Sequence, residues 1–459
     1  MAQSAPDMSK HFTIPALLRY ALPSIAMAIF TSIYGIVDGL FISNYAGTTA
    51  FAAVNFIMPV IMILSTTGFM FGTGGSAIIS IMRGKGDAQG ANRTFSLIVY
   101  TTLATGVILS VIGIIGCRWI SETMGATGEM LDDCTLYGRL VFLSLTGYVL
   151  QCAFQSLMMA AGKPKLGFGI TVASGLANIV LDFVLVGVMG MGIVGAALAT
   201  NVSEWLGGLA PIIYFARKNS SFLRLGKTSF NGRLLGKICA NGSSEMMTNL
   251  AVSLISVIYN LQLLAYIGEN GVAAYGVIMY VFLIFEAVFI GYSMATGPLL
   301  GYQYGARNFA EMRSLTKKSI AIVLVAGIFV FGFAQLLAWP LSQAFCSYDQ
   351  DLAAYTEHAF RLFYLCFLFA GFNVYGSSFF TALGNGVVSA AISFVRTLVL
   401  ETLFVLVLPM VFGPEALWYA CLIADFLAAL IVTGCMKYFA PVYGYGKNGM
   451  TKPRKAKKA

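Results

Sequence analysis

Residues 41–60, FISNYAGTTAFAAVNFIMPV, return in a recognisable form at residues 262–281 as QLLAYIGENGVAAYGVIMYV. Seven of these twenty positions are identical without a gap, at a constant offset of 221 residues. The same register continues into two polar loops, where Gly84 matches Gly305. Apolar segments share residues by chance, but a register kept through loops and apolar runs indicates an internal repeat. We therefore expect two halves with the same fold.

The composition identifies the environment of these halves. The chain has 459 residues, of which 58% are hydrophobic and only 10% are charged. Soluble domains are about 45–50% apolar and about 25% charged. This excess of apolar residues excludes soluble enzymes, nucleic-acid-binding proteins and disordered chains, and predicts an integral membrane protein.

The apolar runs give the number of membrane crossings, because a spanning helix needs about 20 apolar residues. Twelve such runs occur, approximately at 14–43, 50–81, 94–117, 135–161, 165–187, 191–216, 238–267, 271–303, 315–340, 355–383, 387–411 and 415–438. We predict an all-α protein of twelve transmembrane helices in two pseudo-symmetric six-helix bundles, 14–216 and 238–438. Since six is even, both halves point the same way, as parallel repeats of transporters do.

The basic residues predict the orientation. With the N-terminus in the cytoplasm, 24 of the 28 Lys and Arg residues fall on the inner side. They occupy the helix ends, the inner loops, the N-terminal tail 1–13, the linker 217–237 and the C-terminal tail 439–459. Positive charge is retained inside, so we expect a multi-pass protein of the cytoplasmic (inner) membrane with both termini cytoplasmic. We expect the basic tail to attract anionic lipid rather than nucleic acid.

Cysteine and histidine predict little chemistry. The eight cysteines contain no C-x-x-C pair and most lie in apolar runs, as expected for small core residues. A disulfide between Cys117 and Cys134 is left open by their positions near an outer loop. The chain has two histidines, which makes a histidine-based metal site improbable.

Acidic residues inside spans are costly and often mark ion pathways. Asp38 and Asp182 each lie on an outward-running span, about six residues, or about 9 Å, below its outer end. Asn178 shares a helix face with Asp182, and Thr200 enters the next span at a depth that lets it join them. Two close carboxylates in a dry site cannot both ionise cheaply, so we expect the pair to hold a proton or a cation. A polar knot that only holds helices together is the alternative.

The repeat confines this pair to the first half. Asp38 aligns with Tyr259, and Asp182 aligns with Phe404 after a one-residue shift. We therefore expect asymmetric coupling in the first half alone.

The remaining acids have weaker interpretations. Glu245 and Glu286 lie where they could line an inward cavity and attract a cationic substrate. Glu401 follows Arg396 by five residues, which favours a buried ion pair between them. Glu204 and Asp425 occupy equivalent positions, which favours a shared structural role, although the sequence does not fix it.

One motif in the chain is misleading. GMGIVG at 190–195 matches G-x-G-x-x-G, but it lies in a short turn between two spans with no strand before it. Nucleotide binding and ATP-driven transport by this chain alone are therefore disfavoured.

The chain resembles the multidrug and toxic compound extrusion (MATE) family, nearest to its MepA-like bacterial branch. The resemblance rests on IYGIVDGLFI at 33–42, NIVLDFVLVGVMGMGIVGAALAT at 178–200, YGARN at 304–308 and the twelve-span plan. It implies export of organic cations and drugs in exchange for H⁺ or Na⁺, with cation coupling at Asp38, Asn178, Asp182 and Thr200. It also implies a hinge at Pro23, where the family's first helix bends. A Na⁺ ion would be held by Asp38, Asn178 and Asp182.

We therefore expect a secondary antiporter, not an enzyme, that needs no cofactor beyond its coupling ion and no obligatory protein partner. Its partners would be small organic cations or drugs and the lipid bilayer. The alternative transporter is a lipid-linked oligosaccharide flippase of related fold, which would need a strongly cationic cavity. A major-facilitator carrier lacks support because its D-R-x-G-R type loop is absent. An intramembrane acyltransferase lacks a suitable histidine, and a passive channel does not explain the repeat.

Overall fold

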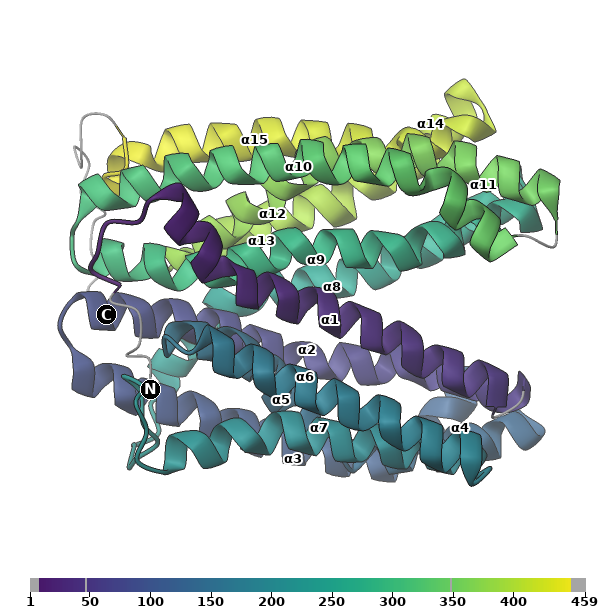
Figure 1. The fold of residues 1–459 in the computed structure, drawn as a ribbon, viewed down its shortest axis with the longest axis horizontal. Helices are drawn as coiled ribbons and strands as arrows, with labels where there is room; N and C mark the ends of the chain where they lie inside the picture. The colour runs from purple at the N-terminus through teal and green to yellow at the C-terminus, as the bar shows by residue number, and fades with distance from the viewer. Residues whose placement is uncertain (1–7, 46–47, 347–348, 447–459) are drawn as a thin grey trace.

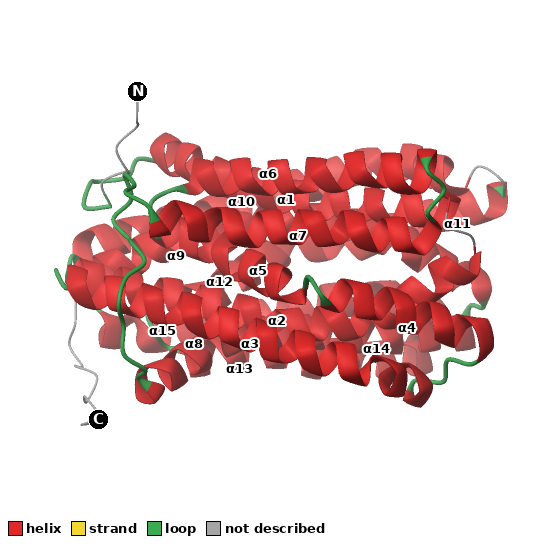
Figure 2. Ribbon diagram, turned by 90° about the horizontal axis from the view of Figure 1, so that it is seen from below, coloured by secondary structure: helices red, strands yellow, loops and turns green. Residues whose placement is uncertain are grey.

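The computed structural model describes residues 8–45, 48–346 and 349–446. Within these ranges every regular element is a helix, and the helices run roughly along one axis (Figures 1 and 2). The predicted tails lie partly outside them, because residues 1–7 and the basic segment from Lys447 to Lys458 are not among the described residues. The all-helical prediction is confirmed.

The elements of the two halves follow each other in chain order. The first half comprises α1 (Ile14–Tyr45), α2 (Thr48–Gly84), α3 (Ala88–Thr123), α4 (Gly128–Phe142), α5 (Leu145–Ala160), α6 (Pro164–Leu181), the π-helical η1 (Asp182–Val188) and α7 (Gly192–Ala216). The second comprises α8 (Gly232–Tyr266), α9 (Glu269–Gly305), α10 (Phe309–Cys346), α11 (Gln350–Phe363), the short η2 (Tyr364–Cys366), α12 (Phe367–Ala382), α13 (Gly386–Ser393), the π-helical η3 (Phe394–Glu401), α14 (Thr402–Phe412), η4 (Pro414–Tyr419) and α15 (Ala420–Tyr443).

Ten helical stretches among the described residues are long and apolar enough to cross a membrane. The pair α4–α5, bent by 54° at Leu143 and Ser144, makes an eleventh. The twelfth is α7, whose 25 residues extend about 37 Å at 1.5 Å per residue. It carries Thr200, Asn201 and Glu204, polar residues that lower its hydropathy. These stretches coincide with the twelve predicted runs, and their ends differ from the predicted ones by at most seven residues.

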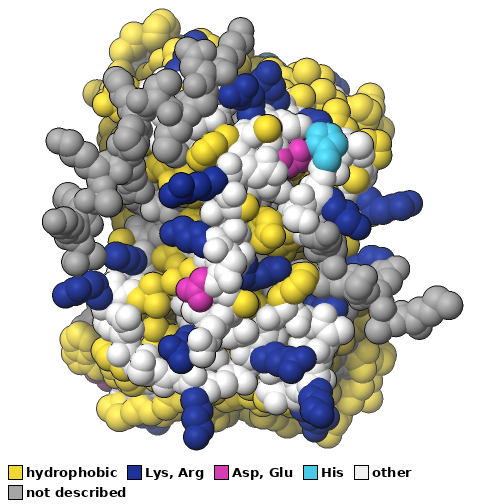
Figure 3. Space-filling model, turned by 90° about the vertical axis from the view of Figure 1, so that its left-hand side faces the viewer, with side chains coloured by type: hydrophobic (Ala, Val, Ile, Leu, Met, Phe, Trp, Pro, Cys, Tyr) yellow, Lys and Arg dark blue, Asp and Glu magenta, His cyan; other side chains and the backbone are white. Residues whose placement is uncertain are grey.

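Both described ends of the chain lie on one face of the bundle, which we call the terminal face. The Met8 carbonyl accepts a hydrogen bond of 2.8 Å from Gln303 Nε2, and the Gly446 carbonyl accepts one from Arg313. Lys and Arg side chains gather on this face and outnumber acidic ones (Figure 3). The arrangement fits an even number of crossings and the predicted side of positive charge.

The two halves touch backbone to backbone near the terminal face. A Cβ atom added to Gly242 of α8 would lie 1.9 Å from the Met70 carbonyl oxygen of α2. One added to Gly305 of α9 would lie 2.1 Å from the Ile81 oxygen. The ribbons of the two halves are closest at this end and diverge toward the other (Figure 1). The molecule is therefore closed at its terminal face, and glycine is required for that closure.

The N-terminal segment 8–13 is bound to the second half. The Phe12 amide donates to Glu311 Oε1 at 3.0 Å, and Lys318 Nζ donates to the Phe12 carbonyl at 2.6 Å. Met8 is buried against Gln303 and also contacts Arg83 of the first half. The start of α1 is therefore fixed before the helix enters the bundle.

The connection between the halves is bound to the first half. Arg224 N donates to Asn92 Oδ1 at 2.9 Å, and Gly226 N donates to Ser96 Oγ at 3.0 Å. Helix α8 starts at Gly232, inside the predicted linker 217–237, because the Asn231 side chain caps the Leu234 amide.

Candidate cation-coupling site

The structure brings Asp38, Asn178 and Asp182 together across α1 and α6. The Asp38 carboxylate lies close enough to the Asp182 carboxylate and the Asn178 amide for the three groups to influence one another electrostatically. All three residues are buried, and Asp182 has no exposed surface. The juxtaposition predicted from depth and helix face is therefore present in the fold.

Local structure explains why α1 approaches α6 so closely. A Cβ at Gly175 would lie 2.5 Å from the Phe30 ring, so the absence of a side chain lets the two helices pack tightly. About two turns further, α6 changes into the π-helix η1, and Asp182 is its first residue. π-Helical turns in α-helices occur frequently at functional sites.

The two carboxylates lack hydrogen-bond donors. Asp38 Oδ1 and both carboxylate oxygens of Asp182 are buried with no hydrogen-bond partner among the described residues. Two ionised carboxylates cannot donate to each other, and an uncompensated buried charge is costly. The arrangement is chemically complete only when a proton is shared between them or a cation binds.

Helix α7 carries further polar groups near this pair. The Thr200 hydroxyl, predicted to join the cluster, is buried without a hydrogen-bond partner in the described chain. Thr200 therefore lies on a helix beside the site, but the structure shows no contact between its side chain and either aspartate. Glu204 interacts with Ser144 at the α4–α5 break and lies within electrostatic range of Asp38.

Sequence reasoning missed the aromatic wall of the site. Tyr137 of α4 is fully buried, and its hydroxyl has no partner among the described residues. It lies within electrostatic range of Asp38, Asp182 and Glu204. Tyrosines are common in this chain, so no sequence signal distinguished this one from ordinary packing.

The predicted substrate-cavity acids lie in the second half. Glu245 of α8 and Glu286 of α9 are partly exposed and close enough to influence each other electrostatically. Glu286 also feels the charges of Arg396 and Asp425. The two acids therefore share one electrostatic environment in the second half.

The predicted ion pair between Arg396 and Glu401 is wrong. Arg396 instead pairs with Asp425 of α15, through Nε to Oδ1 at 2.5 Å and Nη2 to Oδ2 at 3.3 Å. Asn373 Nδ2 adds a 3.0 Å bond to Asp425 Oδ1. The physical reason is geometric, because the two oxygens of Asp425 match the guanidinium fork from a neighbouring helix.

The MatE family model matches residues 23–184 and 245–407, one copy in each half. The chain belongs to the MatE family. The two matched segments coincide with the internal repeat and together cover well over half of the sequence.

Curated relatives carry the name multidrug export protein MepA. The protein from Staphylococcus haemolyticus is 26% identical over 432 residues, covering 91% of this chain and 92% of that protein. The protein from Staphylococcus aureus strain NCTC 8325 is 26% identical over 425 residues, covering 90% and 91%.

Solved MATE structures share the fold. An outward-facing conformation of a multidrug resistance MATE family transporter aligns with a TM-score of 0.89 at 22% identity, covering 96% of this chain and 99% of that one. A MATE in the straight conformation gives 0.87 at 23% identity, with 95% and 97% coverage. The bent conformation gives 0.84 at 23% identity, with 92% and 95% coverage. This MatE chain therefore has the twelve-helix fold of these structures.

Proposed function

We propose that this MatE protein is a secondary antiporter that exports lipophilic organic cations in exchange for H⁺ or Na⁺. The observation that carries the proposal is the buried pair Asp38 and Asp182, whose oxygens lack donors and require a proton or cation. Family membership and the names of the MepA relatives support the direction of transport and the class of substrate.

The chain's own residues supply the coupling. The terminal face is closed and basic, which supports a cytoplasmic position for it and an outward-facing state for the molecule. A proton or Na⁺ arriving from the opposite side would be held by Asp38, Asn178 and Asp182. Its charge removes the repulsion between the carboxylates, so α1 can pack more closely on α6.

Substrate recognition is assigned to the second half. Glu245 and Glu286 are partly exposed carboxylates that can attract an organic cation at the start of transport. The coupling ion and the substrate then act on different halves. Each ion or substrate shifts the equilibrium only by binding one conformation more tightly than the other.

The test uses purified protein in liposomes with a fluorescent organic cation. Transport is followed under an imposed pH gradient and then under a Na⁺ gradient, for wild type and Asp38→Asn. We expect one of the two gradients to drive transport by the wild type. The transport rate of Asp38→Asn should be at least about tenfold lower, since one carboxylate cannot replace the pair.

The matched control is Asp132→Asn, because the Asp132 side chain is 75% exposed and lies outside the site. Full coupled transport by Asp38→Asn would contradict the proposed coupling site. Transport driven by neither gradient, from folded wild type, would favour the lipid-linked oligosaccharide flippase instead.

A further inference from the structure

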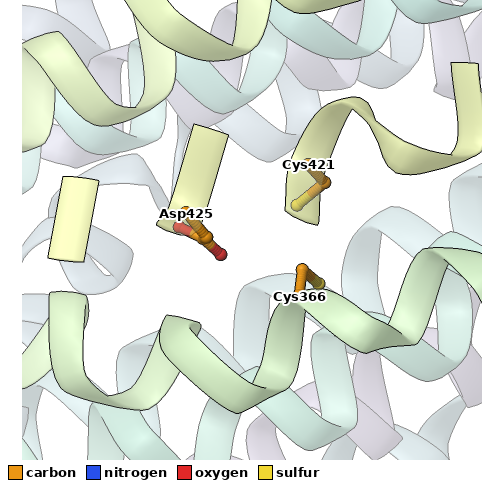
Figure 4. Close-up of side chains that lie close together, drawn as sticks. All are labelled: Cys366, Cys421 and Asp425. Carbon is orange, nitrogen blue, oxygen red and sulfur yellow. The ribbon is translucent and has the colours of Figure 1, made fainter. Parts of the chain in front are cut away.

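A cluster of metal-ligand atoms lies in the second half, apart from the aspartate pair. The Sγ atoms of Cys366 and Cys421 and a carboxylate oxygen of Asp425 lie within 4.8 Å of one another. Cys366 ends η2, whereas Cys421 and Asp425 occupy the first turns of α15 (Figure 4). All three residues are buried, at 0%, 5% and 2% exposure.

The two thiols lie near each other, with their Sγ atoms within 4.8 Å. The Cys366 and Cys421 side chains interact with each other, and both lie within electrostatic range of Arg396 and Glu401 or Asp425. The thiolate is the form of cysteine that binds metal, so the ion itself must drive the loss of both thiol protons when it binds.

The oxygen ligands are also partly available. Asp425 Oδ1 accepts from Arg396 and Asn373, but Oδ2 has only the 3.3 Å contact with Arg396. Asn373 is 1% exposed, and its Oδ1 has no hydrogen-bond donor among the described residues. Its amide is held beside Asp425 by the Nδ2 contact, so this unpartnered oxygen belongs to the same cluster.

Charge decides which ion suits the cluster. Two thiolates and one carboxylate carry three negative charges, and Arg396 supplies one positive charge. A divalent cation makes the sum zero, which reduces the cost of burying the charges. Two sulfur ligands select a borderline or soft ion over Na⁺, Mg²⁺ or Ca²⁺, which prefer oxygen.

We propose that Cys366, Cys421 and Asp425 form a site for a thiophilic divalent cation of the Zn²⁺ and Cd²⁺ class. Binding replaces two S–H bonds by two S–metal bonds and releases both thiol protons to the solvent. Ligand atoms around tetrahedral zinc lie about 3.5–3.8 Å apart, so the separations here, at most 4.8 Å, need to shorten by no more than about 1 Å when the ion binds. The ion then joins the kink in the tenth span to the start of the twelfth.

The experiment titrates reduced, full-length protein in detergent with CdCl₂ and records the ultraviolet cadmium–thiolate charge-transfer band. Wild type should bind one Cd²⁺ per chain, and Zn²⁺ should compete for it. Cys366→Ser and Cys421→Ser should each lose at least half of the band, because each removes one of two thiolates.

The matched control is the double variant Cys117→Ser/Cys134→Ser, since these buried cysteines also adjoin each other, in the first half. It should keep the full band. Gel filtration and thermal unfolding establish that each variant is folded. The proposal is overturned if folded wild type gives no band, if the band survives Cys366→Ser, or if fresh protein contains a Cys366–Cys421 disulfide. None of these results bears on antiport at Asp38.

Discussion

Carboxylates in the two halves have opposite surroundings. Asp38 and Asp182 face each other with no donor for three of their oxygens, whereas Asp425 accepts hydrogen bonds from Arg396 and Asn373. The first-half pair needs a mobile cation, and the second-half residue already has a positive charge attached to the chain. This difference agrees with coupling confined to the first half.

The contributions of Arg396 and Asp425 to the stability of the protein should depend strongly on each other. Arg396→Met leaves a buried carboxylate without its counter-ion, and removing one partner of such a pair costs about 3–5 kcal/mol. The double variant Arg396→Met/Asp425→Leu removes both charges and should regain most of the loss. Thermal unfolding of the detergent-purified variants measures both values. A double variant no more stable than Arg396→Met would contradict this interdependence.

The sequence identified the aspartate pair but not the arginine's partner. Asp38 and Asp182 were predictable because charged residues in apolar runs are rare and helix depth is simple arithmetic. Arg396 and Asp425 are 29 residues apart on different helices, so their contact depends on how two helices rotate against each other. Sequence spacing suggested Glu401 because it reports neighbours on the same helix only.

Two of the three glycines of helix α8, six residues apart, have different surroundings. Gly242 lies against the backbone of Met70, while a Cβ at Gly236 meets nothing within 4 Å. Only the first is needed for the halves to close at the terminal face. Glycine inside a helix lowers its stability, so a glycine at position 242 needs an explanation. The close approach of the two backbones provides that explanation.

Gly242→Leu should therefore hold the terminal face open. A Cβ 1.9 Å from the Met70 oxygen forces α2 and α8 apart. We expect coupled transport to fall at least about tenfold and the distance between spin labels at Lys85→Cys and Arg307→Cys to lengthen. Gly236→Leu is the matched control and should match wild type in both measurements. An unchanged label distance in folded Gly242→Leu would refute the role of this contact.

Helix positions were predictable to within seven residues at each end, but their irregularities were not. Apolar length gives each span directly. The α4–α5 bend falls at Leu143 and Ser144, where no glycine or proline marks it. The π-helices η1 and η3 likewise carry no distinctive residues, because one inserted residue is accommodated by packing rather than by local propensity.

At the scale of the whole molecule, α1 belongs to both halves. Its start is bound to α10 through Phe12, Glu311 and Lys318, while Asp38 near its end meets Asp182 of the first half. Pro23 lies between these attachments, and proline removes a backbone hydrogen bond from the helix. Pro23 is therefore placed where relative movement of the halves would act on α1, and the hinge at this residue stays a prediction.

Pro23→Ala should stiffen this connection. Alanine restores the missing amide donor, so α1 resists bending, and transport should fall severalfold while thermal stability is kept or increased. Initial transport rates in liposomes and unfolding temperatures provide the two readouts. Pro409→Ala, inside α14 of the second half, is the control and should transport normally. Wild-type rates for Pro23→Ala would argue against bending at this residue.

The bound connection between the halves limits how they can rotate. Thr228 Oγ1 donates to the Arg93 carbonyl, and the Asn231 side chain caps α8. Only about three residues therefore separate the anchored end of the connection from the start of a helix. Such a short connection lets the second half rotate but keeps its distance from the anchored segment nearly constant. The second half can swing about this point, but it cannot drift away from the first or slide along it. The covalent connection thus limits translation of one half relative to the other more than it limits rotation.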